Sequence, residues 1–148
     1  MADKVSIVNL TPWTQGFKRI NTVGHISIPA YGRLNIETEE VVSQCYAKNN
    51  QFTGEDGHGS HARIYVEDPA IRKEFEFETE TSKQKVLTDD KLAKLFEYKR
   101  MGDFEKSMKD LVVIHAERFV LVEYIKKHKI NDYEKIKAVE RFTGVPMN

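Results

Sequence analysis

The chain has 148 residues, of which 40% are hydrophobic and 31% are charged, as is typical of a soluble protein with enough apolar residues for a core. Lys and Arg together number 23, as do Asp and Glu, so no bulk charge draws the chain to nucleic acid or to an anionic membrane. Cys45 is the only cysteine, which excludes an intramolecular disulfide and favours a reducing compartment.

The hydropathy pattern predicts a protein that does not enter a membrane. The first ten residues, MADKVSIVNL, lack the long apolar run of a signal peptide. No other run approaches the roughly 18 apolar residues of a membrane span. We therefore expect a cytoplasmic protein.

The N-terminal part alternates between apolar and polar residues in short runs, which indicates β-strands. We expect strands at 4–10, 17–23, 25–29 and 33–36, and again at 62–66 and 74–78. Between them, residues 37–49 place Val41, Val42, Cys45 and Tyr46 on one helical stripe. Cys45 is expected to be a small buried core residue of that helix rather than a reactive thiol. These elements form a β-rich module with one helix, at residues 1–78.

The rest of the chain is expected to be helical. Residues 79–87 are mostly polar and predict a linker. Helices follow at 88–98, 104–127 and 131–143, which form a helical hairpin plus one short helix in a domain at 88–148. The middle of the long helix is apolar on more than one face, so either the β-rich module or another chain must cover its second face. The predicted fold class is α+β.

The stretch FTGEDGHGSHARIYVED, residues 52–68, concentrates glycines, histidines and acids in one loop before a strand. Three interpretations are open. Asp56, His58 and His61, with Glu55 nearby, offer ligands for zinc or a similar ion, although they include only two firm ligands. The glycine N–H groups, with Arg63, could cradle an anion, although no Walker or Rossmann spacing is present. The third interpretation, which we favour, is a loop that contacts a protein partner.

Two features of the helical part have a chemical and a structural interpretation. His115 lies in the apolar stripe of the long helix, and no nucleophile or second base accompanies it, so we expect a core histidine. Lys126, Lys127 and Lys129 form a basic cluster that could touch phosphates. Acidic residues interleave with the basic ones that follow, and the helix dipole favours cations there, so a solvated face is the preferred interpretation.

The run from Ile28 to Asp68 resembles small accessory proteins of tailed bacteriophages, such as capsid-associated or head-decoration proteins. The resemblance rests on a short β module with a Gly/His loop, followed by a polar segment and a helical tail. It implies a non-enzymatic virion component that contacts a coat or connector protein. Such a protein would be found in the host cytoplasm during assembly and then in the virion. The resemblance assigns no site residue.

These observations favour a non-catalytic assembly protein that self-associates and binds a coat or connector protein, with no cofactor. The residues expected to contact partners lie in the Gly/His loop and on the long helix: Asp56, His58, His61, Arg63, Phe119 and Val122. The alternative is a small nucleic-acid-binding or regulatory protein that uses Lys126, Lys127 and Lys129. A third hypothesis is a metal-dependent enzyme at His58 and His61.

Overall fold

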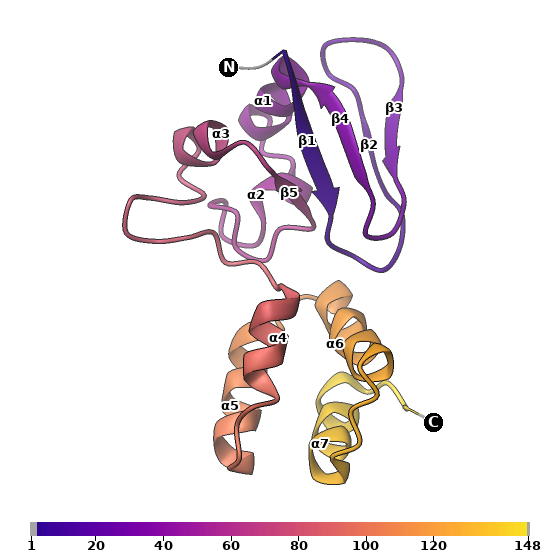
Figure 1. Cartoon of the computed structure of the whole chain (residues 1–148). Coiled ribbons are helices and arrows are strands. Elements are labelled where there is room, and N and C mark those ends of the chain that lie inside the picture. The colour runs from indigo at the N-terminus through magenta and orange to yellow at the C-terminus, as the bar shows by residue number, and fades with distance from the viewer. Residues whose placement is uncertain (1–2, 148) are drawn as a thin grey trace. The chain divides into compact units, whose positions relative to one another are not determined.

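The structure is a computed structural model that describes residues 3–147. The chain divides between Val86 and Leu87 into two units. Strands occur in the first unit and four helices make up the described part of the second (Figure 1). Each unit has a hydrophobic core of its own. The predicted α+β class is confirmed.

The first unit contains an antiparallel sheet with the strand order β4-β1-β5 and a separate hairpin of β2 and β3. Three helices accompany the strands. In chain order the elements are β1 (Lys4–Asn9), β2 (Gln15–Lys18), β3 (His25–Ile28), β4 (Arg33–Glu37), α1 (Thr38–Tyr46), α2 (Asn50–Thr53), β5 (Ile64–Val66) and α3 (Pro69–Glu74).

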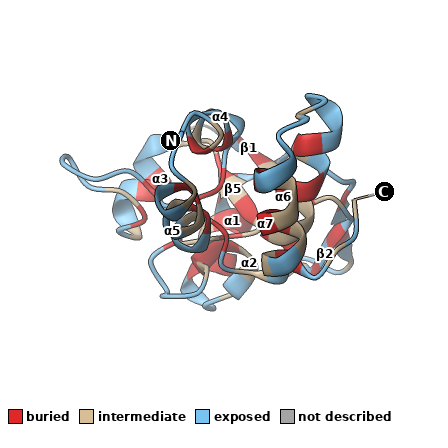
Figure 2. Cartoon of the chain, turned by 90° about the horizontal axis from the view of Figure 1, so that it is seen from below, coloured by how far each residue is buried: buried red, intermediate tan, exposed pale blue. Residues whose placement is uncertain are grey.

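The core of this unit follows from the alternation along the strands. Val5 and Ile7 of β1 point inward, and Val5 lies opposite Ile36 of β4, so both strands cover the same core. Figure 2 shows the buried residues along the strands and on the inward sides of the helices. The core consists of Val5, Ile7, Phe17, Ile26, Ile28, Ile36, Val41, Cys45, Phe52, Ile64, Val66, Ile71 and Phe77.

A buried asparagine organises the turns that connect the strands. Asn9 ends β1 and is 0% exposed. Its side-chain amide donates to the carbonyl groups of Trp13, Ile28 and Pro29 at 2.7–3.0 Å. Its side-chain oxygen accepts from the N–H and the hydroxyl of Thr11 at 2.9 and 2.7 Å. One side chain therefore holds the start and the end of the β2–β3 hairpin together.

A second buried polar group fixes the other end of the hairpin to α1. Glu40 is 1% exposed, and its carboxylate accepts from the N–H groups of Ile20 and Asn21 at 3.0–3.1 Å. One turn further along α1, the Gln44 amide donates to the Lys18 carbonyl at 2.8 Å. Buried polar groups must find partners, and these two find them on the hairpin backbone. The hairpin and α1 are thus joined by directed bonds as well as by apolar packing.

The strand expected at 74–78 is wrong. Residues 69–74 form α3, which begins with Asp68 as its N-cap and Pro69 in the first turn, and residues 75–77 form a turn. The N–H of Phe77 donates to the carbonyl of Arg72 at 2.8 Å, and Glu76 has a φ of 61°. The Phe/Glu alternation arises because the turn buries Phe77 and exposes Glu76, and not because a strand has two faces.

The segment expected to be a linker, 79–87, belongs to the first unit up to Val86. Gln84 is 6% exposed and donates to the carbonyl of Gly59 at 3.0 Å. The carbonyl of Lys85 accepts from the N–H of His61 at 2.6 Å. The end of this polar segment is therefore bonded to the Gly/His loop, which its composition does not reveal.

The second unit consists of four helices around a core of leucine, valine and aromatic residues. The helices are α4 (Asp89–Leu95), α5 (Met101–Leu111), α6 (His115–Lys127) and α7 (Tyr133–Thr143). Thr88 caps α4, as expected, by accepting from the N–H of Lys91 at 3.3 Å. Gly144, with a φ of 73°, ends α7. Among residues 3–147, no helix has the length and apolar character needed to cross a membrane.

The single helix expected at 104–127 is wrong, because α5 ends at Leu111 and α6 begins at His115. Val112 and Ile114 are extended, and such β-branched residues favour extended backbone. The carboxylate of Glu117, 6% exposed, accepts from the N–H groups of Val113 and Ile114 at 2.9 and 3.0 Å. Glu117 thereby stabilises a helix start inside what looks like one continuous apolar pattern.

The Asn9 network predicts a large stability loss on truncation. We expect Asn9→Ala to lower the free energy of unfolding of the first unit by about 2–4 kcal/mol, because buried carbonyl groups lose their donor. Urea unfolding followed by the fluorescence of Trp13, the only tryptophan, measures this unit directly. Asn35→Ala, at an exposed position of β4, is the matched control and should cost little. Equal losses for the two variants would contradict the role of Asn9.

The Glu117 cap predicts a local effect in the second unit. In Glu117→Ala, the amides of Val113 and Ile114 should exchange with solvent faster by about tenfold or more, since their acceptor is gone. Hydrogen exchange followed by NMR measures this, and Glu97→Ala, at an exposed position, is the control. Unchanged protection of both amides in Glu117→Ala would show that the helix break does not depend on this carboxylate.

Candidate functional site

The Gly/His loop is folded around the carboxylate of Asp56. This group accepts from the N–H groups of His58 and Ser60 at 2.8 and 3.2 Å, and from the Ser60 hydroxyl at 2.6 Å. Burial raises the pKa of Asp56, but these hydrogen bonds outweigh burial and hold its pKa below the usual range. The loop is therefore fixed by its own side chain.

Two glycines of the loop are required by close packing. Gly54 and Gly59 have φ values of 72° and 85°, a region that other residues rarely adopt. A Cβ atom at Gly54 would collide with the carbonyl of Ser60. A Cβ atom at Gly59 would lie 2.8–2.9 Å from side-chain atoms of Gln84 and Phe77. The glycines serve the packing of the loop against the rest of the unit.

Most of the N–H groups that could bind an anion in this loop already have acceptors within the chain. The N–H groups of His58 and Ser60 bind Asp56, and those of Glu55 and Gly59 bind backbone carbonyl groups at 2.9 and 2.6 Å. Arg63 donates to the side chain of Asn50 at 2.9 Å. The carboxylate of Asp56 occupies the place that an external anion would take.

The metal interpretation lacks a set of ligands. Within residues 3–147, no three His, Cys, Asp or Glu side chains lie together in a way that could hold a metal ion. Both carboxylate oxygens of Asp56 are used inside the loop. The Nδ1 atom of His58 lies 4.0 Å from the carboxylate of Glu76, and the side chain is 60% exposed.

Beside the loop lies a cleft of about 410 Å³, which the sequence did not predict. It is formed by the C-terminal ends of α1 and α2, by Gly57 of the loop and by the turn after α3. We call it the aromatic cleft. It is lined by Cys45, Tyr46, Lys48, Thr53, Gly57, Phe75 and Phe77.

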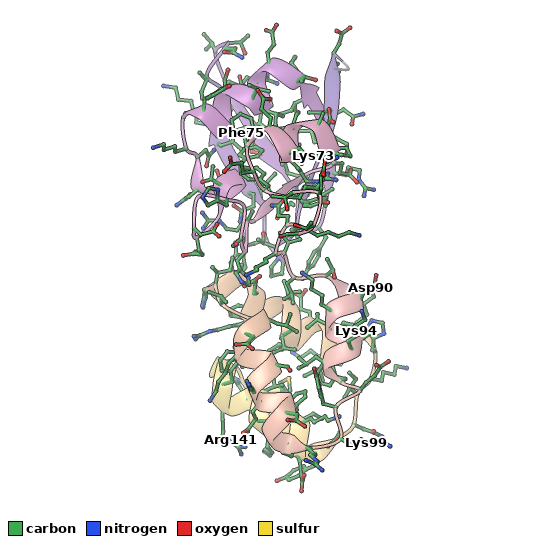
Figure 3. The ribbon with its side chains drawn as sticks, turned by 90° about the vertical axis from the view of Figure 1, so that its left-hand side faces the viewer. Lys73, Phe75, Asp90, Lys94, Lys99 and Arg141 are labelled. Carbon is green, nitrogen blue, oxygen red and sulfur yellow. The ribbon has the colours of Figure 1, made fainter. Side chains whose placement is uncertain are left out.

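Aromatic rings give the cleft its character. The rings of Tyr46 and Phe75 meet edge to face, with centroids 4.9 Å apart and an interplanar angle of 75°. Phe77 follows at 6.1 Å from Phe75. Tyr46 is 68% exposed, whereas Phe77 is buried, so the wall runs from solvent to the core. Figure 3 shows Phe75 on the near side of the first unit in that view.

The cleft also has a thiol and charged groups. Burial, and secondarily the carboxylate of Glu74, raise the pKa of Cys45 to about 12. The oxygen of Glu74 lies 3.5 Å from the hydroxyl of Tyr46. Lys48, which is exposed and has a φ of 59°, is the only charged residue among those that line the cleft. Cys45 is 4% exposed, so the prediction of a buried core cysteine is confirmed.

The predicted partner residues of the long helix lie elsewhere and are less accessible than expected. Val122 is 3% exposed and belongs to the core of the second unit, so it cannot form part of a docking surface in this structure. Phe119 is half-buried, and its ring meets that of His115 at 5.0 Å. His115 is exposed at the start of α6, so the expectation of a core histidine is wrong. The helix break places it at a helix end.

The apolar excess of the long helix also has a local explanation. α6 packs against α4 and against α7 of the same unit. Leu121 and Ile125 are buried in the shared core, and Phe96, the C-cap residue of α4, stacks on Tyr124 at 5.7 Å. α6 thus has apolar neighbours on two sides within the second unit.

The basic cluster is exposed at the end of α6. Lys126, Lys127 and Lys129 are all exposed, and the first two lie in the last helical turn, where the helix dipole favours cations. Their position thus has a structural explanation. Binding of nucleic acid by these lysines stays a prediction.

A smaller groove of about 250 Å³ lies between α4 and α5. Leu95 and Leu111 give it an apolar part, and Lys91, Lys94 and Asp110 give it charged groups. Of these, Lys94 is labelled in Figure 3. The aromatic cleft is larger and adjoins the loop singled out by its sequence, so it is the stronger candidate.

The raised pKa of Cys45 predicts a slow reaction with thiol reagents. At about pH 8, a disulfide-exchange reagent should label folded Cys45 about a thousandfold more slowly than an exposed cysteine, since the thiolate is the reacting species. Absorbance of the released thiol measures the rate. The same chain in urea is the control and should react fast. Rapid labelling of the folded chain would contradict a protonated, buried thiol.

Comparison of the chain with known proteins finds no match. The chain matches no protein-family model, no curated protein and no solved structure. These comparisons therefore neither support nor contradict the resemblance to phage accessory proteins.

Proposed function

We propose that the chain is a non-catalytic protein-binding module whose first unit receives a side chain of a protein partner in the aromatic cleft. The single observation that carries this proposal is the cleft itself, with Tyr46 exposed at its mouth and Phe77 buried at its base. Concave sites with aromatic walls and few polar groups are typical binding sites. Tyrosine is also among the residues that contribute most to the binding energy of protein interfaces.

The surroundings of the cleft support binding by a rigid site. The loop that contributes Gly57 is fixed by Asp56 and is bonded to the segment at Gln84 and Lys85. A site that is ordered before binding loses little conformational entropy when the partner arrives. Asp56 thus acts through the loop shape rather than through a contact of its own.

The chemistry of the cleft also favours binding over catalysis. Its thiol, Cys45, has a pKa of about 12 and is protonated at neutral pH. A protonated thiol is a weak nucleophile. The cleft thus provides apolar surface and shape, which are the properties of a recognition site.

The partner class remains the one that the phage resemblance implies, a coat or connector protein. The apolar excess of the predicted long helix no longer supports self-association through the helical unit, because α4 and α7 pack against the apolar faces of α6. The proposal therefore rests on the first unit, and on a partner that is a different protein.

Selection of random displayed peptides on the immobilised full chain tests the proposal. We expect selected peptides to bind the wild-type chain, and Tyr46→Ala to weaken them by about tenfold or more, as at an interface hot spot. Fluorescence anisotropy of labelled peptides measures the affinities. Tyr133→Ala is the matched control, because Tyr133 is 71% exposed and Tyr46 is 68% exposed.

Two outcomes would contradict the proposal. One is a selection that yields no binding peptide. The other is a set of peptides that bind wild type and Tyr46→Ala equally, which would place the binding surface outside the aromatic cleft. Unfolding followed by Trp13 fluorescence checks that each variant remains folded.

A further inference from the structure

The charges around the aromatic cleft are unequal. Among the residues that line it or adjoin a lining residue in sequence, three carboxylates, those of Asp56, Glu74 and Glu76, outnumber one lysine, Lys48. A fourth carboxylate in this set, Glu78, lies 3.2 Å from the guanidinium of Arg72, so its charge is compensated. With His58 neutral, the sum is −2. The surroundings of the cleft therefore favour a cation.

Glu74 and Glu76 flank Phe75 in the sequence. Glu74 lies 3.5 Å from the hydroxyl of Tyr46, and both glutamates are exposed. The side chain of Glu76 is 74% exposed and points to the same region as His58, 4.0 Å away. Neither carboxylate is paired with a lysine or an arginine within the described part of the chain. Both are available to an incoming cation.

The field of Glu74 reaches the cleft interior. Its carboxylate is the electrostatic cause, after burial, of the raised pKa of Cys45. This agrees with the sum of charges, in which carboxylates outnumber the single lysine, Lys48.

We propose that the partner group received by the aromatic cleft is an arginine side chain, with its guanidinium against the exposed ring of Tyr46 and the carboxylates of Glu74 and Glu76. This inference rests on the proposed function and names the chemistry of its partner. The aliphatic part of the arginine packs on Phe75, and a cation placed over a tyrosine ring is attracted by the ring electrons.

Arginine suits this arrangement better than lysine does. Its guanidinium is planar, stacks on aromatic rings and donates two parallel hydrogen bonds to a carboxylate. It is also less strongly hydrated than an ammonium group, so entry into an apolar cleft costs less. The exposed ring of Tyr46 and the nearby carboxylate of Glu74 match these properties.

NMR titration of the full chain with a short glycine peptide that has one central arginine tests the inference. The matched peptide has citrulline in place of arginine, which keeps the shape and removes the charge. The amide signals of Thr53 and Gly57, which line the cleft, report binding. We expect saturable shifts with the arginine peptide at up to about 10 mM, and binding of the citrulline peptide weaker by about fivefold or more.

Charge variants of the chain should move the affinity in opposite directions. Glu74→Gln should weaken binding of the arginine peptide by about threefold, and Lys48→Met should strengthen it by a similar factor. Glu39→Gln is the control, since Glu39 is exposed at the other end of α1, about 10 Å along the helix axis from Tyr46. It should leave the affinity unchanged.

Three outcomes would overturn the inference. Equal binding of the arginine and citrulline peptides would show that the cleft selects shape alone. Tighter binding of a third peptide, with glutamate in place of arginine, than of the arginine peptide would show that the partner group is acidic if Glu74→Gln strengthened that binding further. Absence of shifts with the arginine peptide would show that the cleft does not take this side chain. In each case the displayed-peptide selection decides separately whether the cleft binds proteins at all.

Discussion

The hydrogen bonds of Asn9 are the constraint on which the first unit depends. They hold together the segment that leads into β2 and the segment that leaves β3, and Thr11 extends them to Gln15 at 3.1 Å. Gln15 in turn accepts from Gln51 of α2 at 2.7 Å. Phe17 of the hairpin meets Phe52 of the same short helix at 5.2 Å. Because α2 leads directly into the Gly/His loop, the turn network and the loop are parts of one connected structure.

The unusual composition of the Gly/His loop serves this structure more than it serves chemistry. Asp56 binds the loop amides, Gly54 and Gly59 permit close packing, and Gln84 attaches the loop to the segment that precedes the second unit. A loop held in this way can support one wall of a cleft without taking part in binding directly. The groups best placed to contact a partner are then the neighbouring aromatic residues, which contribute apolar area and the face of a ring.

The helical unit shows how an apolar excess in a sequence can be misread. α6 has apolar residues around much of its circumference because it packs between α4 and α7. A helix with two neighbours needs two apolar faces, and such a pattern does not by itself indicate another chain. Glu117 adds a second source of error, since one buried carboxylate separates two helices that share a continuous apolar pattern.

The α+β class, most strands, α1, the cap of α4 and the end of α7 can be predicted from the sequence, because these depend on local periodicity and on capping residues close in the chain. The turn at Phe75–Phe77, the attachment of Gln84 and the aromatic cleft become visible only in the folded chain. The cleft joins Tyr46 to Phe75 across 29 positions in sequence, and their contact of 4.9 Å depends on how the end of α1 lies against the turn after α3. No local pattern encodes such a contact, because side-chain burial there is set by residues that are distant in the chain.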